Sequence, residues 1–419
     1  MLKLILSDSN RSGNDQELTL DQIARQGAQE LLKKALAEEV NTYLQDHETS
    51  KDEGGKHLVV KNGKGKQRTI LTGSGELKVE APRINDRRVG KKFTSKILPP
   101  YLRKSPNVES VLPILYLKGL SANTFSEALE ELFGGQVKGL SKSTIHALKS
   151  SWEKDLDTWR ASQIEERFVY LWADGVHVKV RLGEDKKLCL LVVMGVTESG
   201  EKKLLAVHAG YRESKTSWNE VFSDLERRGL RAPLAIVGDG ALGLWACTGE
   251  MKLFKKTKEL RCWVHKMGNV LDKLPKRTQP RAKSLLQDMM NAETENDAYK
   301  SRKVFEAELH EKFPKAVDCL TKDWKALTGH FSFPAKHWLH IRTTNPIESM
   351  FATVKLRTKV TKGAGSLKMA ETMAFKLMKE AEKKWRRIRG HDEIKKVLEG
   401  AVYKDGKLVE AKIDQQEIA

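Results

Sequence analysis

The clearest hydrophobic pattern in the sequence is a pair of apolar runs that each end in an aspartate followed by a glycine. Residues 168–173 alternate aromatic and aliphatic side chains, and residues 234–237 are wholly aliphatic. Such unbroken apolar runs are typical of strands buried on both faces. Because strand side chains alternate, one face of the first strand should carry Phe168, Tyr170, Trp172 and Asp174. Asp-Gly pairs also occur in ordinary turns, and Asp174 taken alone favours that interpretation.

The elements between the two runs predict the fold of the central region. Residues 187–196 and 203–208 supply two further strands, and residues 217–228 have the spacing of a helix. Three antiparallel strands, a helix and a parallel strand form the opening of an RNase H-like α/β fold, whose first and fourth strands are adjacent. This fold would place Asp174 beside Asp239, at strand ends where α/β sheets bind their ligands.

A fifth strand is expected over residues 259–266, and it runs into a helix over residues 267–274. Cys262 and His265 in this stretch have the spacing of half a zinc site. Zinc needs about four ligands, and the other cysteines offer no partner spacing nearby, so a structural zinc site is disfavoured. An active-site histidine and a simple core pair are the interpretations that remain open.

A polar, helical segment over residues 280–339 precedes the next acidic motif. This segment predicts an all-helical insertion, because it is longer than one strand and a connection require. A helix then runs from Asn345 to about residue 361, and Glu348 near its start has two interpretations. With Asn345 as N-cap and Pro346 first in the helix, Glu348 would complete a start that resembles a capping box. Alternatively, Glu348 is a metal-binding carboxylate; spacing alone favours the cap.

Composition narrows the class of protein. The 419 residues are 39% hydrophobic, which is enough for a folded core in two or three domains. Lys and Arg number 75 against 56 Asp and Glu, so the net charge of +19 favours a polyanionic partner, most simply nucleic acid. Four scattered cysteines and the lack of a long apolar run predict a soluble protein of the cytoplasm with reduced thiols and no membrane contact.

The N-terminal third combines a helix with a basic segment. Residues 18–44 predict a long amphipathic helix that serves as domain core or as a dimer seam, with core preferred. Residues 51–104 are rich in Lys, Arg and Gly, and they contain a hairpin over 67–72 and 76–81. Arg68 and Arg83 flank this hairpin as candidate phosphate contacts, although a solvated basic linker is an equal alternative.

Residues 121–159 predict a helix-turn-helix. One helix is expected over residues 124–133, and Gly134-Gly135 separates it from a second that Ser141 caps. The second helix would present short polar and basic groups to a major groove. These candidates are Lys142, Ser143, His146 and Lys149. An ordinary helical hairpin is the competing explanation.

Two further stretches are candidates for DNA contact. The end of the insertion carries Lys336, Trp338 and Arg342, where an aromatic ring could stack on an unpaired base. The preferred alternative places Trp324 and Trp338 in the core of the insertion itself. Residues 368–396 are helical and basic, and either follow the DNA backbone or form a solvated helix face.

Taken together, four motifs resemble the bacterial insertion-sequence transposases of the Mutator-like DDE family (MULE-type). In chain order they are Asp174-Gly175, Asp239-Gly240, Cys262-Trp263-Val264-His265 and Thr343-Thr344-Asn345-Pro346-Ile347-Glu348. The resemblance spans most of the chain, including the hairpin, the helix-turn-helix and the basic stretch after the glutamate. That stretch adds Lys355, Arg357 and Lys359 to the candidate DNA contacts.

The resemblance implies a DDE transposase with Asp174, Asp239 and Glu348 as metal ligands and His265 near the active site. It would bind the terminal inverted repeats of an element, nick the DNA and join the 3′-hydroxyl ends to target DNA. Two divalent ions about 4 Å apart suit this chemistry, because they stabilise the attacking and leaving oxygens together. Oxygen ligands favour Mg²⁺ or Mn²⁺. We expect His265 to hydrogen-bond a carboxylate or the scissile phosphate without binding metal.

These interpretations divide the chain into seven segments. They are a helical region (1–50), a basic hairpin region (51–108), the helix-turn-helix (109–162), the first part of the core (163–275), the insertion (276–342), the second part of the core with basic helices (343–400) and a tail (401–419). A homodimer at the nucleoid is the expected assembly, since two element ends must meet. A structure-specific RNase H-like nuclease and an inactive, transposase-derived regulator are the alternatives.

Overall fold

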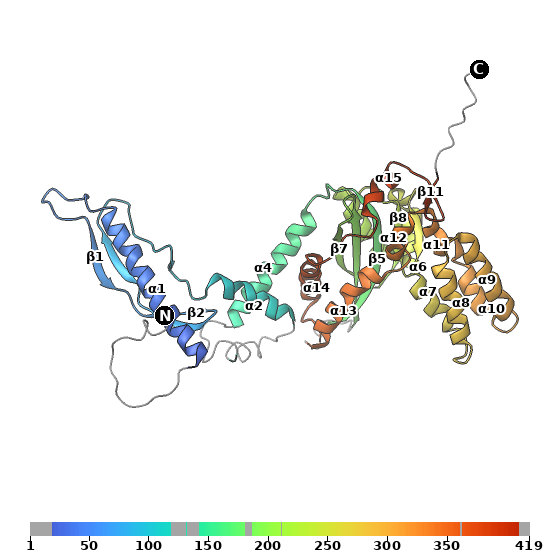
Figure 1. Ribbon diagram of the computed structural model, residues 1–419, viewed down its shortest axis with the longest axis horizontal. Helices are drawn as coiled ribbons and strands as arrows, with labels where there is room; N and C mark the ends of the chain where they lie inside the picture. Colours follow the sequence, from blue (N-terminus) through green and yellow to red (C-terminus); the bar gives the residue numbers. More distant parts are fainter. Residues whose placement is uncertain are drawn as a thin grey trace, which may run out of the picture. The chain divides into compact units, whose positions relative to one another are not determined.

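The computed structural model describes residues 19–118, 131, 142–180, 187–210, 212–360 and 363–409. The chain forms two compact units, Met1–Leu148 and Lys149–Ala419 (Figure 1). No helix within the described ranges is long and apolar enough to cross a membrane.

The first unit is built on helix α1 (Leu20–Gln45), which Thr19 caps through a reciprocal pair of hydrogen bonds with Gln22. The predicted hairpin is present as β2 (Arg68–Thr72) and β3 (Gly75–Val79), paired antiparallel. Leu36 of α1 is buried in a cluster with side chains of this hairpin. The predicted core role of α1 is thus confirmed for this part of the helix, whereas Leu20 and Leu31 are exposed.

A second strand pair in this unit was missed by the sequence pattern. It consists of β1 (Val59–Lys64) and β4 (Pro82–Asp86), and helix α2 (Pro106–Lys118) follows. The two candidate arginines beside the hairpin differ. The Arg68 guanidinium donates to the carbonyls of Leu98 (3.0 Å) and Pro99 (3.2 Å), so it holds a neighbouring loop. The Arg83 side chain is exposed and can still meet a phosphate.

The predicted helix-turn-helix is described only in its second half. Its first helix, residues 124–133, lies outside the described residues apart from Glu131. The second helix is α4 (Lys142–Ala161), where Trp152 and Leu156 are buried. His146 is exposed, while the side chains of Lys142 and Ser143 lie outside the described set.

A five-stranded mixed sheet organises the second unit. Its strands are β5 (Phe168–Lys179), β6 (Lys187–Thr197), β7 (Lys202–Gly210), β8 (Ala235–Gly238) and β9 (Lys258–Arg261). The order across the sheet is β7-β6-β5-β8-β9, with β5, β6 and β7 antiparallel and with β8 and β9 parallel to β5. The predicted meander and the predicted pairing of the first strand with the fourth are therefore both present.

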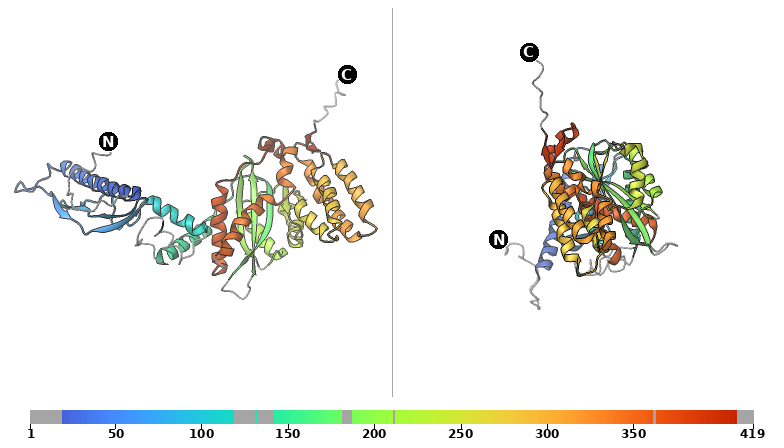
Figure 2. Two further views of the ribbon diagram at one scale, coloured as in Figure 1. Left: turned by 60° about the horizontal axis from the view of Figure 1, so that its bottom comes forward. Right: turned by 90° about the vertical axis from the view of Figure 1, so that its right-hand side faces the viewer.

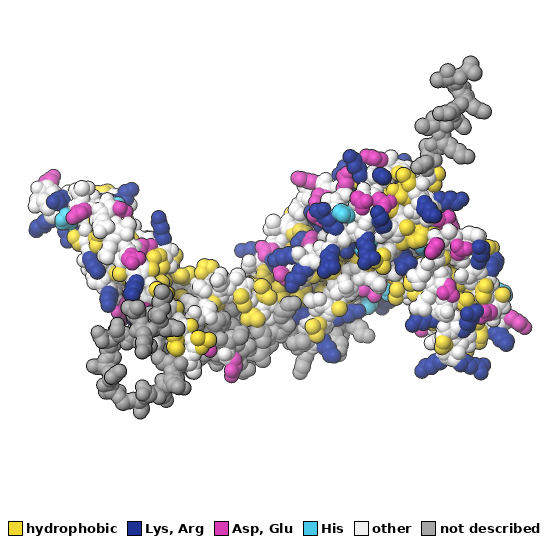
Figure 3. Space-filling view, viewed as in Figure 1, with side chains coloured by type: hydrophobic (Ala, Val, Ile, Leu, Met, Phe, Trp, Pro, Cys, Tyr) yellow, Lys and Arg dark blue, Asp and Glu magenta, His cyan; other side chains and the backbone are white. Residues whose placement is uncertain are grey.

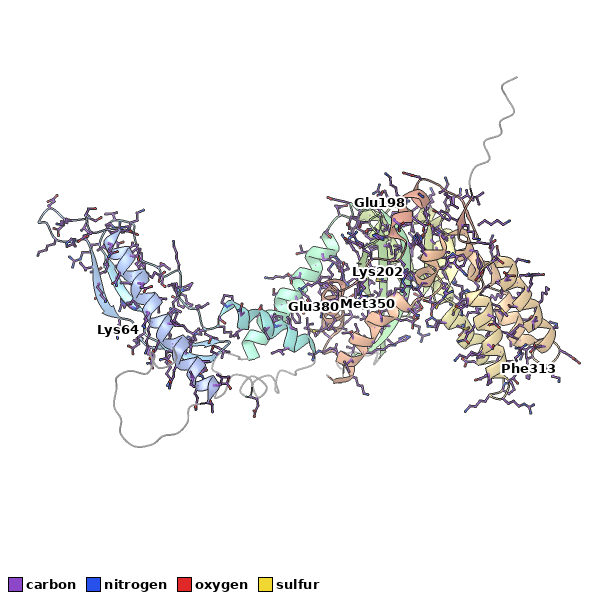
Figure 4. The ribbon with its side chains drawn as sticks, in the orientation of Figure 1. Lys64, Glu198, Lys202, Phe313, Met350 and Glu380 are labelled. Atoms are coloured by element: carbon purple, nitrogen blue, oxygen red, sulfur yellow. The ribbon has the colours of Figure 1, made fainter. Side chains whose placement is uncertain are left out.

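Helices cover both faces of this sheet (Figure 2). One face packs against α5 (Lys215–Arg227) and α6 (Leu242–Glu250), and Trp218 and Phe222 of α5 are fully buried there. The other face meets α13 (Asn345–Val360) and α14 (Leu367–Glu382). Met350 of α13 and Lys202 of β7 mark this region in Figure 4, and Lys and Arg side chains gather near it in Figure 3.

One residue of the first strand is not on its predicted face. Phe168 belongs to the cluster that contains Leu171 and Ala173, whereas Tyr170 contacts His337 on the opposite side. The reason is an irregularity in the pairing of β5 with β6 between Phe168 and Tyr170, which changes the alternation. Tyr170, Trp172 and Asp174 keep the predicted alternation beyond that point.

A helical insertion separates β9 and α7 (Trp263–Leu271) from α13. It comprises α8 (Gln279–Asn291), α9 (Glu295–Leu309), α10 (Pro314–Thr321), α11 (Trp324–Thr328), a 3₁₀ turn η3 (Gly329–Ser332) and α12 (Ala335–Ile341). Its core contains Leu286, Phe305 and Leu320 together with Trp263 of α7. The insertion is thus packed against the helix that follows the last strand of the sheet.

The basic segment near the C-terminus is partly neutralised. Lys368 and Lys376 of α14 form ion pairs with Asp157 and Asp155 of α4. Short elements follow: a 3₁₀ turn η4 (His391–Glu393), α15 (Ile394–Leu398), β10 (Tyr403–Lys404) and β11 (Lys407–Leu408). Two cations of α14 are therefore paired within the protein, which neither of the two expected roles, DNA contact or a solvated helix face, had included.

The ion pair between Arg160 and Glu371 yields a test of how α14 is held on the sheet. Glu371 is buried, and Oε1 accepts hydrogen bonds from Arg160 (2.8 Å) and from the Ala209 backbone (2.7 Å). Glu371→Ala should lower the free energy of unfolding by about 3 kcal/mol, because it leaves a part-buried guanidinium unpaired. Glu166→Ala, which breaks the more exposed pair with Lys203, should cost about 1 kcal/mol or less in the same urea titration. Equal losses would contradict this role of Glu371.

Candidate active site

Asp174 and Asp239 meet where β8 ends. The expected strand end at Asp174 is wrong, because β5 continues through Asp174 to Lys179; only Asp239 follows the end of its strand. Ala173 of β5 pairs with Gly238 of β8, so Asp174 and Asp239 come directly after residues that face each other in parallel strands. Asp174 Oδ1 accepts the N–H of Gly175, and Asp239 Oδ1 accepts the N–H of Ala241, both at 2.8 Å. The register of two buried strands therefore brings these two acids together.

A third acid joins them that the sequence pattern did not identify. Glu213 lies between β7 and α5, and its carboxylate comes within 4.8 Å of those of Asp174 and Asp239. No apolar run ending in Asp-Gly marks this position; the only signal was its place after a predicted strand. Gly175 makes the approach possible, because a Cβ atom there would lie 2.3 Å from Glu213 Oε1.

Burial and nearby negative charges raise the pKa values of Asp174 and Glu213. The pKa of Asp174 rises to about 7 because of its burial and the charges of Asp239 and Glu213. The hydrogen bond from the Gly175 N–H and the charge of His265 lower this pKa, but by less. The pKa of Glu213 is raised by burial and by Asp239. A bound divalent cation would offset both the cost of burying a charged carboxylate and the repulsion between the carboxylates. This set of donor atoms therefore fits such an ion.

A second cluster contains Glu348, His265 and Cys262, whose donor atoms also lie within 4.8 Å of one another. Cys262 immediately precedes α7, and His265 lies in the first turn of that helix. The predicted strand over residues 259–266 is thus too long, because β9 ends at Arg261 and the helix begins at Trp263. Glu348 lies in the first turn of α13, and its Oε1 is 3.7 Å from His265 Nδ1. Glu348 is therefore in the cluster with His265, and the two aspartates are in the cluster with Glu213.

The helix start at Glu348 differs from the predicted cap. The carbonyl of Thr344 accepts the N–H groups of Ile347 and Glu348, both at 3.0 Å, so the cap position is Thr344 and not Asn345. Glu348 Oε1 accepts the Thr344 hydroxyl at 2.5 Å. This bond to a side chain differs from a capping box, in which the carboxylate would bind a backbone N–H.

The imidazole of His265 interacts electrostatically with a carboxylate of each cluster, Glu348 and Asp174. Its pKa rises to about 9, chiefly through a hydrogen bond with Cys262 that outweighs burial, and then through the charges of Cys262, Glu348 and Asp174. For Cys262, burial opposes ionisation, but hydrogen bonds from His265 and Thr344 outweigh it and lower the pKa. A protonated imidazole has no free lone pair for a metal, so His265 is suited to donate hydrogen bonds.

The candidate DNA contacts near the insertion and α13 differ in accessibility. The preferred placement of Trp338 in the core of the insertion is confirmed, and the alternative stacking role is wrong, because the ring is buried against Phe331 and donates to the carbonyl of Phe333. Trp324 packs with the same cluster. Arg342 donates to the carbonyl of Met290, and Lys336 pairs with Glu393.

The basic residues of α13 divide in the same way. Arg357 is buried, which removes it from direct contact with a phosphate and corrects that prediction. Lys355 and Lys359 have exposed side chains. The face of the helix on which a basic residue lies therefore decides whether its side chain is buried or exposed.

The chain is similar to one known protein family and to several of its members. Residues 3–387 match the family described as "Transposase, Mutator family". The chain is 46% identical over 308 residues to the transposase for insertion sequence element IS6120 of Mycolicibacterium smegmatis, covering 73% of this chain and 94% of that protein. It is 41% identical over 281 residues to the transposase for element IST2 of Acidithiobacillus ferrooxidans, covering 67% and 94% respectively.

The raised pKa of Asp174 predicts a pH-dependent effect of Asp174→Asn on stability. Without divalent ions, the wild-type protein loses stability as pH rises from the unfolded pKa of about 4 through the folded pKa of about 7, whereas Asn cannot ionise. The melting temperature of Asp174→Asn should therefore exceed that of the wild type by about 5 °C at pH 7.5 and by less at pH 5. Added Mn²⁺ should stabilise the wild type more than the variant.

Differential scanning fluorimetry with and without EDTA measures both effects. Asp318→Asn, on the exposed face of α10, is the matched control and should melt like the wild type at either pH. A difference between Asp174→Asn and the wild type that does not change with pH would contradict the repulsion between buried carboxylates.

Proposed function

The chain belongs to the Mutator family of transposases, and from that premise we propose that it is a DDE transposase. It would bind the terminal inverted repeats of an insertion sequence, nick DNA at the element ends and join the 3′-hydroxyl ends to target DNA. The observation that carries the proposal is the meeting of Asp174, within β5, and Asp239, just after the adjacent parallel strand β8, next to an acidic and imidazole cluster.

The carboxylates are the proposed metal ligands. Asp174, Asp239 and Glu348 would hold Mg²⁺ or Mn²⁺, two ions per site, and the bound ions would stabilise the attacking and leaving oxygens of a phosphodiester. The donor set supports hard cations, since the carboxylate oxygens outnumber the single thiol and imidazole of the second cluster. The buried thiol of Cys262 already interacts with Thr344 and His265.

His265 is proposed to act as a charged hydrogen-bond donor. Its imidazolium lies 3.7 Å from Glu348, and the charge of Asp174 also acts on its pKa. A cation at this position can orient the carboxylate, and it can donate to an oxygen of the scissile phosphate, where negative charge develops during reaction. The part of His265 would therefore be electrostatic, without direct ligation of an ion.

The fold assignment is part of the same proposal. The sheet order β7-β6-β5-β8-β9, with three antiparallel strands followed by two parallel ones, supports an RNase H-like core. Helices α8 to α12 would be the insertion before the glutamate. Helix α4 would be the recognition helix of a helix-turn-helix, with His146 exposed on it.

DNA contact is proposed for the basic residues whose side chains are accessible. Arg83 of the first unit and Lys355 and Lys359 of α13 are exposed, and each phosphate they neutralise would release counterions. We expect a homodimer acting on DNA at the nucleoid, because two element ends must be brought together for joining.

Removal of one proposed metal ligand should abolish DNA nicking and leave the affinity for DNA unchanged. Asp174→Asn, Asp239→Asn and Glu348→Gln should each lower Mg²⁺-dependent nicking of a labelled element end by about 10³-fold or more, since each takes away a charge that holds the ions. Gel-shift affinity for the same DNA should stay within about threefold of the wild type. Glu311→Gln, at an exposed position, is the control. Normal nicking by Glu348→Gln would remove that residue from the metal site.

The same assay tests the donor role of His265. His265→Ala should lower the nicking rate about 10²-fold, as expected for loss of one donor that stabilises developing negative charge. His310→Ala removes an exposed imidazole at the end of α9 and should leave the rate unchanged. If His265→Ala nicks at the wild-type rate, His265 has no part in the reaction.

A further inference from the structure

Thr344 lies at the centre of the cluster that contains Glu348. The residue is fully buried and stands between β9–α7 and α13 in contact with both. Its Oγ1 is 2.5 Å from Glu348 Oε1, 3.2 Å from His265 Nδ1 and 3.2 Å from Cys262 Sγ. One hydroxyl group therefore contacts three functional side chains.

The single proton of the hydroxyl determines the direction of these bonds. The hydroxyl has two possible acceptors, Glu348 Oε1 at 2.5 Å and Cys262 Sγ at 3.2 Å. The shorter contact has the length of a charge-assisted bond, so we assign the proton to the carboxylate, and Cys262 Sγ keeps the backbone N–H of Thr344 as a donor. His265 Nδ1 must then carry a proton and donate to Oγ1, since the hydroxyl has no second proton to offer. The bonds run in one direction, from imidazole to hydroxyl to carboxylate, and they occupy Oε1 of Glu348.

We propose that Thr344 is a positioning residue of the active site, whose hydroxyl orients Glu348 and His265 relative to each other. The hydroxyl holds Oε1 of Glu348 in place, and the carboxylate keeps lone pairs with which it would bind an ion. This role rests on the proposed function, in which Glu348 is a metal ligand. Hydrogen-bond partners of metal ligands typically contribute about 10–100-fold to metal affinity or activity.

The hydroxyl can be removed without removing the start of α13. That helix begins on the backbone carbonyl of Thr344, which accepts from Ile347 and Glu348. The backbone N–H of Thr344 donates to Cys262 Sγ at 3.3 Å. Both backbone bonds stay in Thr344→Val, which keeps the branched shape of the side chain. Thr344→Ser keeps the hydroxyl and loses only the methyl group.

Thr343 offers a matched control beside it. Its side chain is also buried, and its Oγ1 has no hydrogen-bond partner in the part of the chain that the structure describes. Thr343→Val makes the same chemical change one residue away and breaks no hydrogen bond of the site.

Mn²⁺ affinity, measured by calorimetry on the full chain, and nicking of a labelled element end are the two readouts. Thr344→Val should lower Mn²⁺ affinity or the nicking rate about 10–100-fold. Thr344→Ser should recover both to within about threefold of the wild type, and Thr343→Val should equal the wild type. The proposal is overturned if Thr344→Val matches the wild type in both, if Thr344→Ser is as impaired as Thr344→Val, or if Thr343→Val loses as much.

Glu348→Gln separates the failure of this inference from failure of the proposed function. If Glu348→Gln is inactive and Thr344→Val is fully active, only the positioning role is wrong. If Glu348→Gln binds Mn²⁺ and nicks like the wild type, the proposed metal role of Glu348 is wrong, and the role of Thr344 falls with it.

Discussion

The close approach of two half-buried carboxylates, Asp239 and Glu213, to the buried Asp174 is the constraint on which the rest of the second unit depends. Asp174 is almost wholly buried, and this burial, together with the charges of Asp239 and Glu213, raises its pKa to about 7. Such a group of like charges is unfavourable in a low-dielectric interior unless the backbone holds it in place. The parallel pairing of β5 with β8 does so, because every residue of β8 is bonded into the sheet on both sides.

The insertion holds the helix that carries the opposing charge. Trp263, two residues before His265, donates its indole N–H to the carbonyl of Leu327 at 2.9 Å. Lys266 donates to the carbonyl of Cys319 at 2.8 Å and pairs with Asp323. Both partners belong to the insertion or its connecting turns, so these helices fix α7 against the sheet. The position of the imidazolium thus depends on residues more than fifty positions further along the chain.

The basic composition has two physical uses in this molecule. Some cations are directed at the protein itself, such as Arg68 and Arg342 toward backbone carbonyls and Lys376 toward Asp155. Others, including Arg83 and Lys359, have exposed side chains. A net charge of +19 predicts a polyanionic partner in either case, but only the three-dimensional contacts separate structural cations from accessible ones.

The sequence by itself determined the apolar strands that carry Asp174 and precede Asp239, the hairpin and the helical insertion, because these follow from local periodicity and turn chemistry. Tertiary structure decided the rest. The bulge that moves Phe168, the burial of Trp338 and Arg357, the approach of Glu213 to Asp174 and the bond from Thr344 to Glu348 depend on packing and on side-chain geometry. Spacing along the chain carries no information on which side chains meet across a folded core, since burial and hydrogen bonding are settled there by shape and charge.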